Sequence, residues 1–202
     1  MSVVRAIILR NVKYSEGDLI VQAFLLDGGK KSFLARGALK SRKRFGGGVL
    51  EATHIVDLIT SESQKDKNLA TLQEARLIES FEGLRTSYDK LDLSLRILAD
   101  VNKVGQEGDV HSADLFNLLG HTFKALETSQ HPLLVEVAFN LKFLHQQGIL
   151  DFREWMRVYL QAPIRDVVQY FETEAKPEEW STHLHEARVQ LREYVQSAEG
   201  RG

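Results

Sequence analysis

A run of basic side chains between residues 30 and 50 carries the clearest chemistry in this sequence. The run reads KKSFLARGALKSRKRFGGGVL and contains seven Lys and Arg residues but no Asp or Glu. The whole chain has 26 basic and 28 acidic side chains, so the rest of it carries a formal charge of −9. Positive charge that is concentrated in one segment of an otherwise acidic chain predicts a binding site for a polyanion.

Nucleic acid is the polyanion that these residue types favour. Clustered Lys and Arg release the counterions held by phosphates, and aromatic rings stack on bases. The expected contacts are Lys30, Lys31, Arg36, Lys40, Arg42, Lys43, Arg44 and Phe45. Phe33 and Phe45 either stack on bases or fill the core, and the glycines 46–48 either keep the loop mobile or let backbone amides approach phosphate. A solvated basic loop with a buried Phe45 is the structural alternative.

Patterns typical of catalysis or metal binding are weak in this chain. It has no cysteine, which excludes disulfides, thiolate zinc sites and cysteine nucleophiles. Residues 29–32 (GKKS) distantly resemble a phosphate-binding loop, but Lys31 occupies the place of its hydroxyl residue. His183 and His185 are two residues apart on a predicted helix, so they point in different directions. We therefore expect no enzyme, no catalytic residue, no metal and no cofactor.

The sequence also predicts no membrane association. No run of about 18 apolar residues occurs, and the N-terminus lacks the pattern of a secretory signal. The expected location is the cytoplasm.

The first 80 residues have the pattern of strands. Residues 3–12, 19–26, 31–36 and 49–60 are rich in apolar and β-branched side chains. Asp27, Gly28 and Gly29 form a hairpin signal, and residues 69–81 fit either a fifth strand or an early helix. Five short strands with one long basic connection predict a five-stranded OB-fold barrel over residues 1–80.

The period of the apolar residues becomes helical after Phe81. Apolar stripes predict helices around residues 84–98, 115–126, 132–148, 152–159, 164–171 and 177–195. Pro132 fits the first turn of one helix and Gly148 its C-terminal cap. The expected architecture is therefore a barrel followed by an all-helical C-terminal domain, residues 81–202.

Several of these segments together resemble the RecO family of bacterial recombination mediators. The matching segments are residues 6–10 (AIILR), 14–21 (YSEGDLIV), 35–47 (ARGALKSRKRFGG), 72–75 (LQEA) and 81–85 (FEGLR). Further similarity occurs at residues 115–119 (LFNLL) and 139–144 (FNLKFL). The segment ARGALKSRKRFGG is the most specific, because glycine, basic and aromatic positions occur in it together.

The resemblance implies an OB-fold followed by a helical domain that binds single- and double-stranded DNA. It implies annealing of complementary strands and help in loading RecA onto protein-coated single strands in the nucleoid. The implied partners are RecR and the acidic C-terminal tail of the single-stranded-DNA-binding protein, for which Lys142 and Phe143 are the candidate contacts. By position, Arg36, Lys40, Arg42 and Arg44 would contact DNA.

One feature departs from the resemblance. Many RecO proteins carry a cysteine zinc site after the helix that corresponds to residues 139–148, whereas this chain has no cysteine. The sequence instead offers Phe152, Trp155 and Tyr159 for packing there. A different class of function also fits the residues, namely a non-enzymatic adaptor whose basic loop binds acidic peptides.

Overall fold

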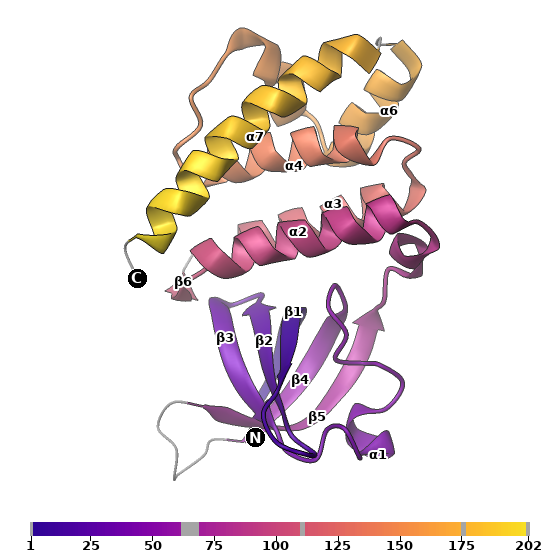
Figure 1. Ribbon diagram of the computed structural model, residues 1–202, viewed down its shortest axis with the longest axis vertical. Coiled ribbons are helices and arrows are strands. Elements are labelled where there is room, and N and C mark those ends of the chain that lie inside the picture. The colour runs from indigo at the N-terminus through magenta and orange to yellow at the C-terminus, as the bar shows by residue number, and fades with distance from the viewer. Residues whose placement is uncertain (1, 62–68, 110–111, 175–176, 201–202) are drawn as a thin grey trace. The chain divides into compact units, whose positions relative to one another are not determined.

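The structure is a computed structural model that describes residues 2–61, 69–109, 112–174 and 177–200 (Figure 1). It divides the chain into two compact units. The first, here called the strand unit, consists of residues 1–81 and 105–116. The second, the helical unit, consists of residues 82–104 and 117–202.

Five strands of the strand unit form a closed ring. They are β1 (Ser2–Lys13), β2 (Leu19–Leu25), β3 (Gly28–Ala35), β4 (Ile55–Ser61) and β5 (Ala70–Glu79). β1 pairs antiparallel with both β2 and β4, and β2–β3 and β4–β5 are also antiparallel. A parallel pairing of β3 with β5 closes the ring. This is the five-stranded OB-fold barrel that the strand pattern predicts, and residues 69–81 are a strand rather than a helix.

Alternate residues of each strand fill the barrel, because successive side chains of a strand point to opposite faces. On β4, Val56 and Leu58 are fully buried in the interior cluster. Phe33 of β3 lies in the same cluster with 1% of its surface exposed. The barrel interior is thus an apolar core, and it holds the ring of Phe33 away from any base.

The fourth strand begins later than its sequence predicts. Val49 and Leu50 belong to a turn, and their buried side chains join the barrel core without forming ladder pairs. The chain then meets β1, where the Thr53 amide donates to the Ile8 carbonyl oxygen at 3.0 Å. Apolar character here reflects burial of a turn, and β4 starts only at Ile55.

A sixth short strand corrects the expectation that the chain is all-helical after Phe81. This strand, β6 (Glu107–Asp109), pairs with the first residues of β3. The Lys30 amide donates to the Gln106 carbonyl oxygen at 3.0 Å. Backbone groups of β3 that the ring leaves available therefore bind a segment about 80 residues away in the sequence. Local sequence patterns do not predict this long-range pairing.

The helices of the second half follow the predicted stripes closely. They are η1 (Glu82–Thr86), α2 (Tyr88–Val104), α3 (Ser112–Thr128), α4 (Pro132–Gln146), η2 (Glu154–Met156), α5 (Arg157–Gln161), α6 (Ile164–Glu174) and α7 (Pro177–Glu199). Pro132 occupies the first turn of α4, where a missing amide hydrogen costs nothing. α4 is buried along almost its whole length and packs against α2, α5, α6 and α7, so it is the core of the helical unit.

An aromatic cluster lies in the region where the sequence offers aromatic side chains in place of the zinc site that the resemblance implies. The Trp155 ring stacks on the His183 imidazole at 4.0 Å between centroids. The Tyr159 hydroxyl and His183 Nδ1 are 3.0 Å apart, and Tyr159 stacks on Phe171. Phe152, by contrast, is largely exposed beneath the Arg157 guanidinium. Aromatic packing thus joins η2, α5, α6 and α7 in this chain.

None of the helices in the described ranges is long and apolar enough to cross a membrane. Among the same residues, no three His, Cys, Asp or Glu side chains are grouped in a way that could hold a metal ion.

Candidate nucleic-acid interface

Six of the eight predicted contacts, five cations and Phe45, lie between β3 and β4. Residues 36–44, here called the basic turn, form a tight turn that leads into the four-residue helix α1 (Arg42–Phe45). All five cations of the basic turn are exposed: Arg36, Lys40, Arg42, Lys43 and Arg44. In the part of the chain that the structure describes, no hydrogen bond or ion pair engages the side chains of Arg42 and Lys43. Their charge therefore remains available to a ligand.

Apolar side chains fasten the basic turn to the barrel. Ala38 within the basic turn and Phe45 directly after it are both buried in the barrel core. Val49 and Leu50, just beyond, are buried in the same cluster. The cations therefore project from an ordered segment, which reduces the conformational entropy that binding would otherwise cost.

Phe45 is consequently a core residue, which corrects its assignment as a DNA contact. Only 6% of its surface is exposed, and the Arg44 guanidinium lies over its ring at 5.3 Å from the centroid. A base could reach this ring only if the turn left the barrel. The alternative of a solvated basic loop with a buried Phe45 therefore describes this ring, and the cations around it are exposed.

A second turn holds the basic turn in place. The Asp18 carboxylate accepts a 2.7 Å hydrogen bond from the Gly37 amide. The Leu39 amide donates to the Gly17 carbonyl oxygen at 3.1 Å. Gly17 and Asp18 thus hold the basic turn at Leu39 and Gly37, and two of the segments that resemble RecO lie side by side.

The pKa of the Asp18 carboxyl favours the ionised form that accepts these hydrogen bonds. Its pKa is lowered, first by the hydrogen bonds from the Gly37 amide and from Ser15, and then by the nearby cations Arg36 and Lys40. The ionised form is the one that accepts these bonds, so the clamp is formed at neutral pH.

The side chain of Arg44 stabilises the basic turn in addition to carrying positive charge. Its Nη2 donates to the Arg36 carbonyl oxygen at 3.0 Å, which ties the end of the turn to its beginning. The Ser41 hydroxyl accepts from the Arg44 amide at 3.3 Å and so caps α1. Arg42 and Lys43 are therefore cleaner probes of ligand binding than Arg44.

At two positions of this segment, the backbone geometry favours glycine for steric reasons. Gly37 has a φ of +65°, a left-handed conformation that favours glycine. Gly46 ends α1 so tightly that a Cβ there would collide with the Arg42 carbonyl oxygen. Gly46 thus closes a tight turn directly after α1.

Lys30 and Lys31 lie apart from the basic turn. They are on the first half of β3, about 16–20 Å along the chain from Arg36 at the usual rise per residue of a strand. Figure 1 shows β6, which pairs with that part of β3, and α1 at opposite ends of the barrel. Lys31 is ion-paired with Glu107 of β6 at 3.5 Å. These two lysines therefore do not extend the cation cluster of the turn.

Arg10 is a basic residue near Lys30 that the sequence reasoning did not single out. Its Nε donates to the Gln22 side chain at 2.6 Å, and the pKa of Lys30 is lowered by burial and then by the charge of Arg10. Their proximity arises because β1, β2 and β3 are neighbours in the ring. An alternation of polar residues on these strands was the only signal for it in the sequence.

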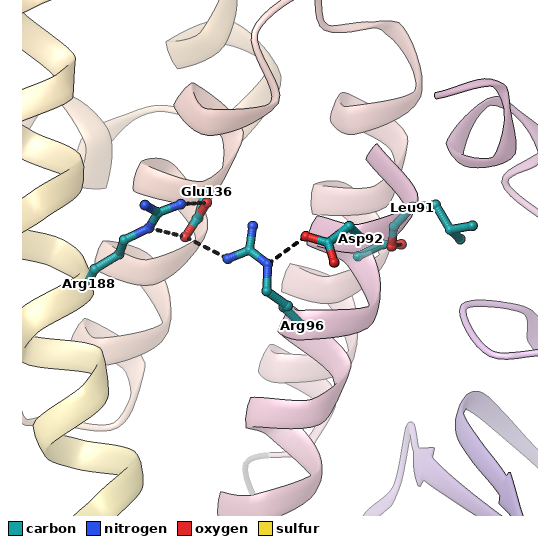
Figure 2. A network of polar contacts seen from close by, with 6 residues as sticks. Leu91, Asp92, Arg96, Glu136 and Arg188 are labelled. Carbon is teal, nitrogen blue, oxygen red and sulfur yellow. Dashed lines mark hydrogen bonds and ion pairs between the residues drawn. The ribbon is translucent and has the colours of Figure 1, made fainter. Parts of the chain in front are cut away.

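Charges in the helical unit are arranged differently. Glu136 of α4 is buried, and Arg188 of α7 binds it with two hydrogen bonds of 2.6 and 2.7 Å. Arg96 of α2 reaches the same carboxylate at 3.4 Å and Asp92 at 3.0 Å (Figure 2). The network joins three helices, so its charges are used inside the unit.

A cavity of about 640 Å³ adjoins this network. Its lining includes Arg96, Arg188 and Lys103, and Lys103 is ion-paired with Glu199 at 3.2 Å. Asp100 also lines it, with a pKa raised chiefly by burial. Because most of the lining cations already have acidic partners, the cavity is not an electropositive site comparable to the basic turn.

The predicted partner contacts Lys142 and Phe143 are not exposed together. Phe143 is fully buried and stacks on Phe139. The Lys142 ammonium donates to the Leu160 carbonyl oxygen at 3.3 Å, and burial lowers its pKa. The aromatic ring is therefore part of the helical core, which removes it from the candidate partner contacts.

Comparison with known proteins agrees with this architecture. The family described as "Recombination protein O N terminal" matches residues 1–81, the part of the chain that forms the barrel. The "DNA repair protein RecO" of Rubrobacter xylanophilus is 30% identical over 145 residues, 71% of this chain and 56% of that protein.

The corresponding proteins of Desulfatibacillum aliphaticivorans and Syntrophobacter fumaroxidans are each 32% identical. They match over 145 and 149 residues, which are 71% and 74% of this chain and 55% and 58% of those proteins. The chain thus spans little more than half the length of these curated relatives. Residues 1–81 of this chain thus match the N-terminal domain of the RecO family, and the similarity to RecO proteins extends over 71–74% of the chain.

Proposed function

We propose that this chain acts in DNA repair and homologous recombination by binding single- and double-stranded DNA through the basic turn. The observation that carries the proposal is the exposed, ordered cation cluster on an OB-fold barrel. Arg42 and Lys43 have no acidic partner among the described residues, whereas Arg96 and Arg188 of the helical unit are both bound to Glu136. Release of phosphate counterions supplies affinity of this kind without regard to base sequence.

Annealing of complementary strands follows from the same chemistry. Cations that neutralise phosphates reduce the repulsion between two strands and leave the edges of the bases free to pair. This role needs neither a nucleotide nor a metal ion. We therefore propose a non-enzymatic mediator that also assists the loading of RecA onto protein-coated single strands at the nucleoid in the cytoplasm.

RecR and the acidic C-terminal tail of the single-stranded-DNA-binding protein are the proposed protein partners. They are suggested by the similarity of this chain to RecO proteins. The proposed division is that residues 1–80 form the DNA-binding domain and that residues 81–202 form the partner-binding domain. Because Phe143 is buried, the tail-binding site has to be found by mapping with a fluorescent tail peptide on variants of exposed residues of the helical unit.

The salt dependence of binding tests the DNA assignment directly. Arg42→Ala/Lys43→Ala is expected to weaken binding to a single-stranded oligonucleotide and to lower the slope of log K against log salt by about 1.4, from about 0.7 per phosphate contact. Fluorescence anisotropy between 50 and 300 mM NaCl, roughly the range over which such binding changes most, measures it. A matched control is Arg165→Ala/Arg192→Ala, which removes two exposed arginines from the helical unit. An unchanged slope in the Arg42/Lys43 variant would contradict the proposal.

The adaptor hypothesis is separated by competition. In one titration, an unlabelled acidic peptide competes with a labelled oligonucleotide bound to the protein. In the other, an unlabelled oligonucleotide of equal charge competes with the labelled peptide. Displacement by the oligonucleotide at much lower concentration supports DNA as the ligand, whereas stronger displacement by the peptide supports the adaptor. Annealing of protein-coated complementary strands without ATP and in EDTA tests the non-enzymatic mechanism.

A further inference from the structure

Tyr14 is an exposed aromatic residue that the folded strand unit does not use. Its side chain is 64% exposed, and no hydrogen bond reaches its hydroxyl from the described residues. The buried Tyr159 contrasts with it, because that hydroxyl is bonded to His183. Neither core packing nor a polar contact therefore accounts for the ring of Tyr14.

The backbone of Tyr14 is fixed beside the basic turn. Its amide donates to the Asp18 carbonyl oxygen at 3.0 Å, which closes the turn of residues 14–18. Asp18 in turn accepts from the Gly37 amide through its carboxylate. Two hydrogen bonds thus connect the exposed ring to the segment that carries the cations.

The cations Arg36 and Lys40 lie close to the turn of residues 14–18. A Cβ placed on Gly17 would lie 3.8 Å from the side-chain carbons of Lys40. Arg36 and Lys40 are both near enough to Asp18 to lower the pKa of its carboxyl. The surface therefore combines an exposed ring with positive charge, the two components that a single strand of nucleic acid requires.

We propose that Tyr14 is a stacking platform for an unpaired nucleobase, with the neighbouring cations of the basic turn holding the adjoining phosphates. The inference rests on the proposed function and deepens it, because it names the feature of DNA that this surface distinguishes. Bases of a duplex are stacked on one another and do not offer a free face to the ring. Tyr14 would therefore give the basic turn a preference for single strands, a role for which Phe33 and Phe45 are too deeply buried.

The test compares single-stranded and duplex oligonucleotides of the same length by fluorescence anisotropy. Tyr14→Ala is expected to weaken single-strand binding roughly 5- to 100-fold, the range measured for loss of one base–aromatic stack. Duplex binding and the salt slope are expected to change little, because no ionic contact is lost. Tyr14→Phe keeps the ring and is expected to bind like the unsubstituted protein.

Tyr88→Ala is the matched control, since Tyr88 is even more exposed but belongs to the helical unit. Circular dichroism verifies that each variant is folded. If Tyr14→Ala binds single strands as tightly as Tyr88→Ala, the stacking proposal is overturned, while a loss in Arg42→Ala/Lys43→Ala would leave the proposed function intact. Equal weakening of single-strand and duplex binding would also overturn it. Failure of the unsubstituted chain to bind DNA would remove the proposed function itself.

Discussion

The basic turn of the strand unit and the Glu136 network of the helical unit use similar side chains in opposite ways. In the turn, hydrogen bonds to backbone groups and the buried anchors Ala38 and Phe45 supply the order, and the exposed side chains of Arg42 and Lys43 have no partner among the residues that the structure describes. In the network, Arg188 and Arg96 are bound to a buried carboxylate. An arginine thus becomes available to a ligand only where other groups hold the chain in place.

Removal of an apolar anchor tests the first half of this comparison and is expected to have the largest effect. Phe45→Ala leaves a cavity in the barrel core, which typically costs about 3–5 kcal/mol in the free energy of unfolding. Urea unfolding measures this loss. Phe45→Leu, which restores most of the volume, is expected to recover both stability and DNA affinity. If Phe45→Leu remains folded but loses DNA binding, the ring itself would be a ligand contact.

Removal of the buried carboxylate tests the second half. Glu136→Ala leaves Arg188 without its partner, and breaking a buried pair costs about 3–5 kcal/mol, with the low end expected because Arg188 is partly exposed. Urea unfolding followed by tryptophan fluorescence reports this unit, because Trp155 and Trp180 both belong to it. DNA affinity at low denaturant is expected to be unchanged.

The exposed pair Glu154–Arg157 is the control for this substitution. Glu154→Ala is expected to change stability within experimental error, since solvent screens such pairs. A loss as large as that in Glu136→Ala would mean that burial does not set the strength of these contacts.

The clamp residue Asp18 gives a prediction whose sign is informative. Charge alone predicts that removal of an acidic group near Arg36 and Lys40 strengthens DNA binding. If the clamp orders the basic turn, Asp18→Ala is expected to weaken binding several-fold, about the entropy of one or two released residues. Asp18→Asn keeps an acceptor for the Gly37 amide and is expected to bind at least as well as the unsubstituted chain. Stronger binding by Asp18→Ala would show that the turn is ordered without the clamp.

The pKa shifts of two aspartates make opposite pH predictions. The pKa of Asp18 is lowered, so its contribution to stability is present above its ordinary pKa and is lost as pH falls through the lowered value. The pKa of Asp100 is raised by burial, so its ionisation costs stability as pH rises from the ordinary value through the raised one.

Asp100→Asn is therefore expected to raise the melting temperature slightly at pH 7 and to have little effect near pH 3, where most of the folded and unfolded aspartate carboxyls bind protons. Thermal unfolding at the two pH values measures the difference, which is the smallest effect expected here. A lower melting temperature at pH 7 would mean that the attraction of Asp100 to Lys103 and Arg96 outweighs its burial.

Much of the fold was predictable because it depends on local patterns. The alternation on β1 to β3 and the stripes of α2, α4 and α7 appear in the sequence at the correct places. The start of β4 was misplaced because apolar residues such as Val49 are buried in a turn as well as in a strand. β6 was missed because its pairing with β3 depends on which backbone groups the closed ring leaves available.

The candidate site was predictable in composition but not in the role of each residue. Charge counting located the basic turn, and five of its cations are exposed as expected. It grouped Lys30 and Lys31 with them, although the length of β3 separates the two sets. It could not detect that Asp18 clamps Gly37 or that the backbone of Tyr14 is bonded to this clamp residue, since Asp18 and Gly37 are neighbours only after β2 and β3 have paired.

The sequence by itself determined the order of the elements, the position of the positive charge and the likeness to RecO, because composition and periodicity are properties of neighbouring residues. Only the tertiary structure decided which side chains are buried in the core and which are exposed to a ligand. The adjacent residues Arg44 and Phe45 make the distinction plain. Burial depends on what the rest of the chain places around a residue, and for Phe45 this is the interior of the barrel.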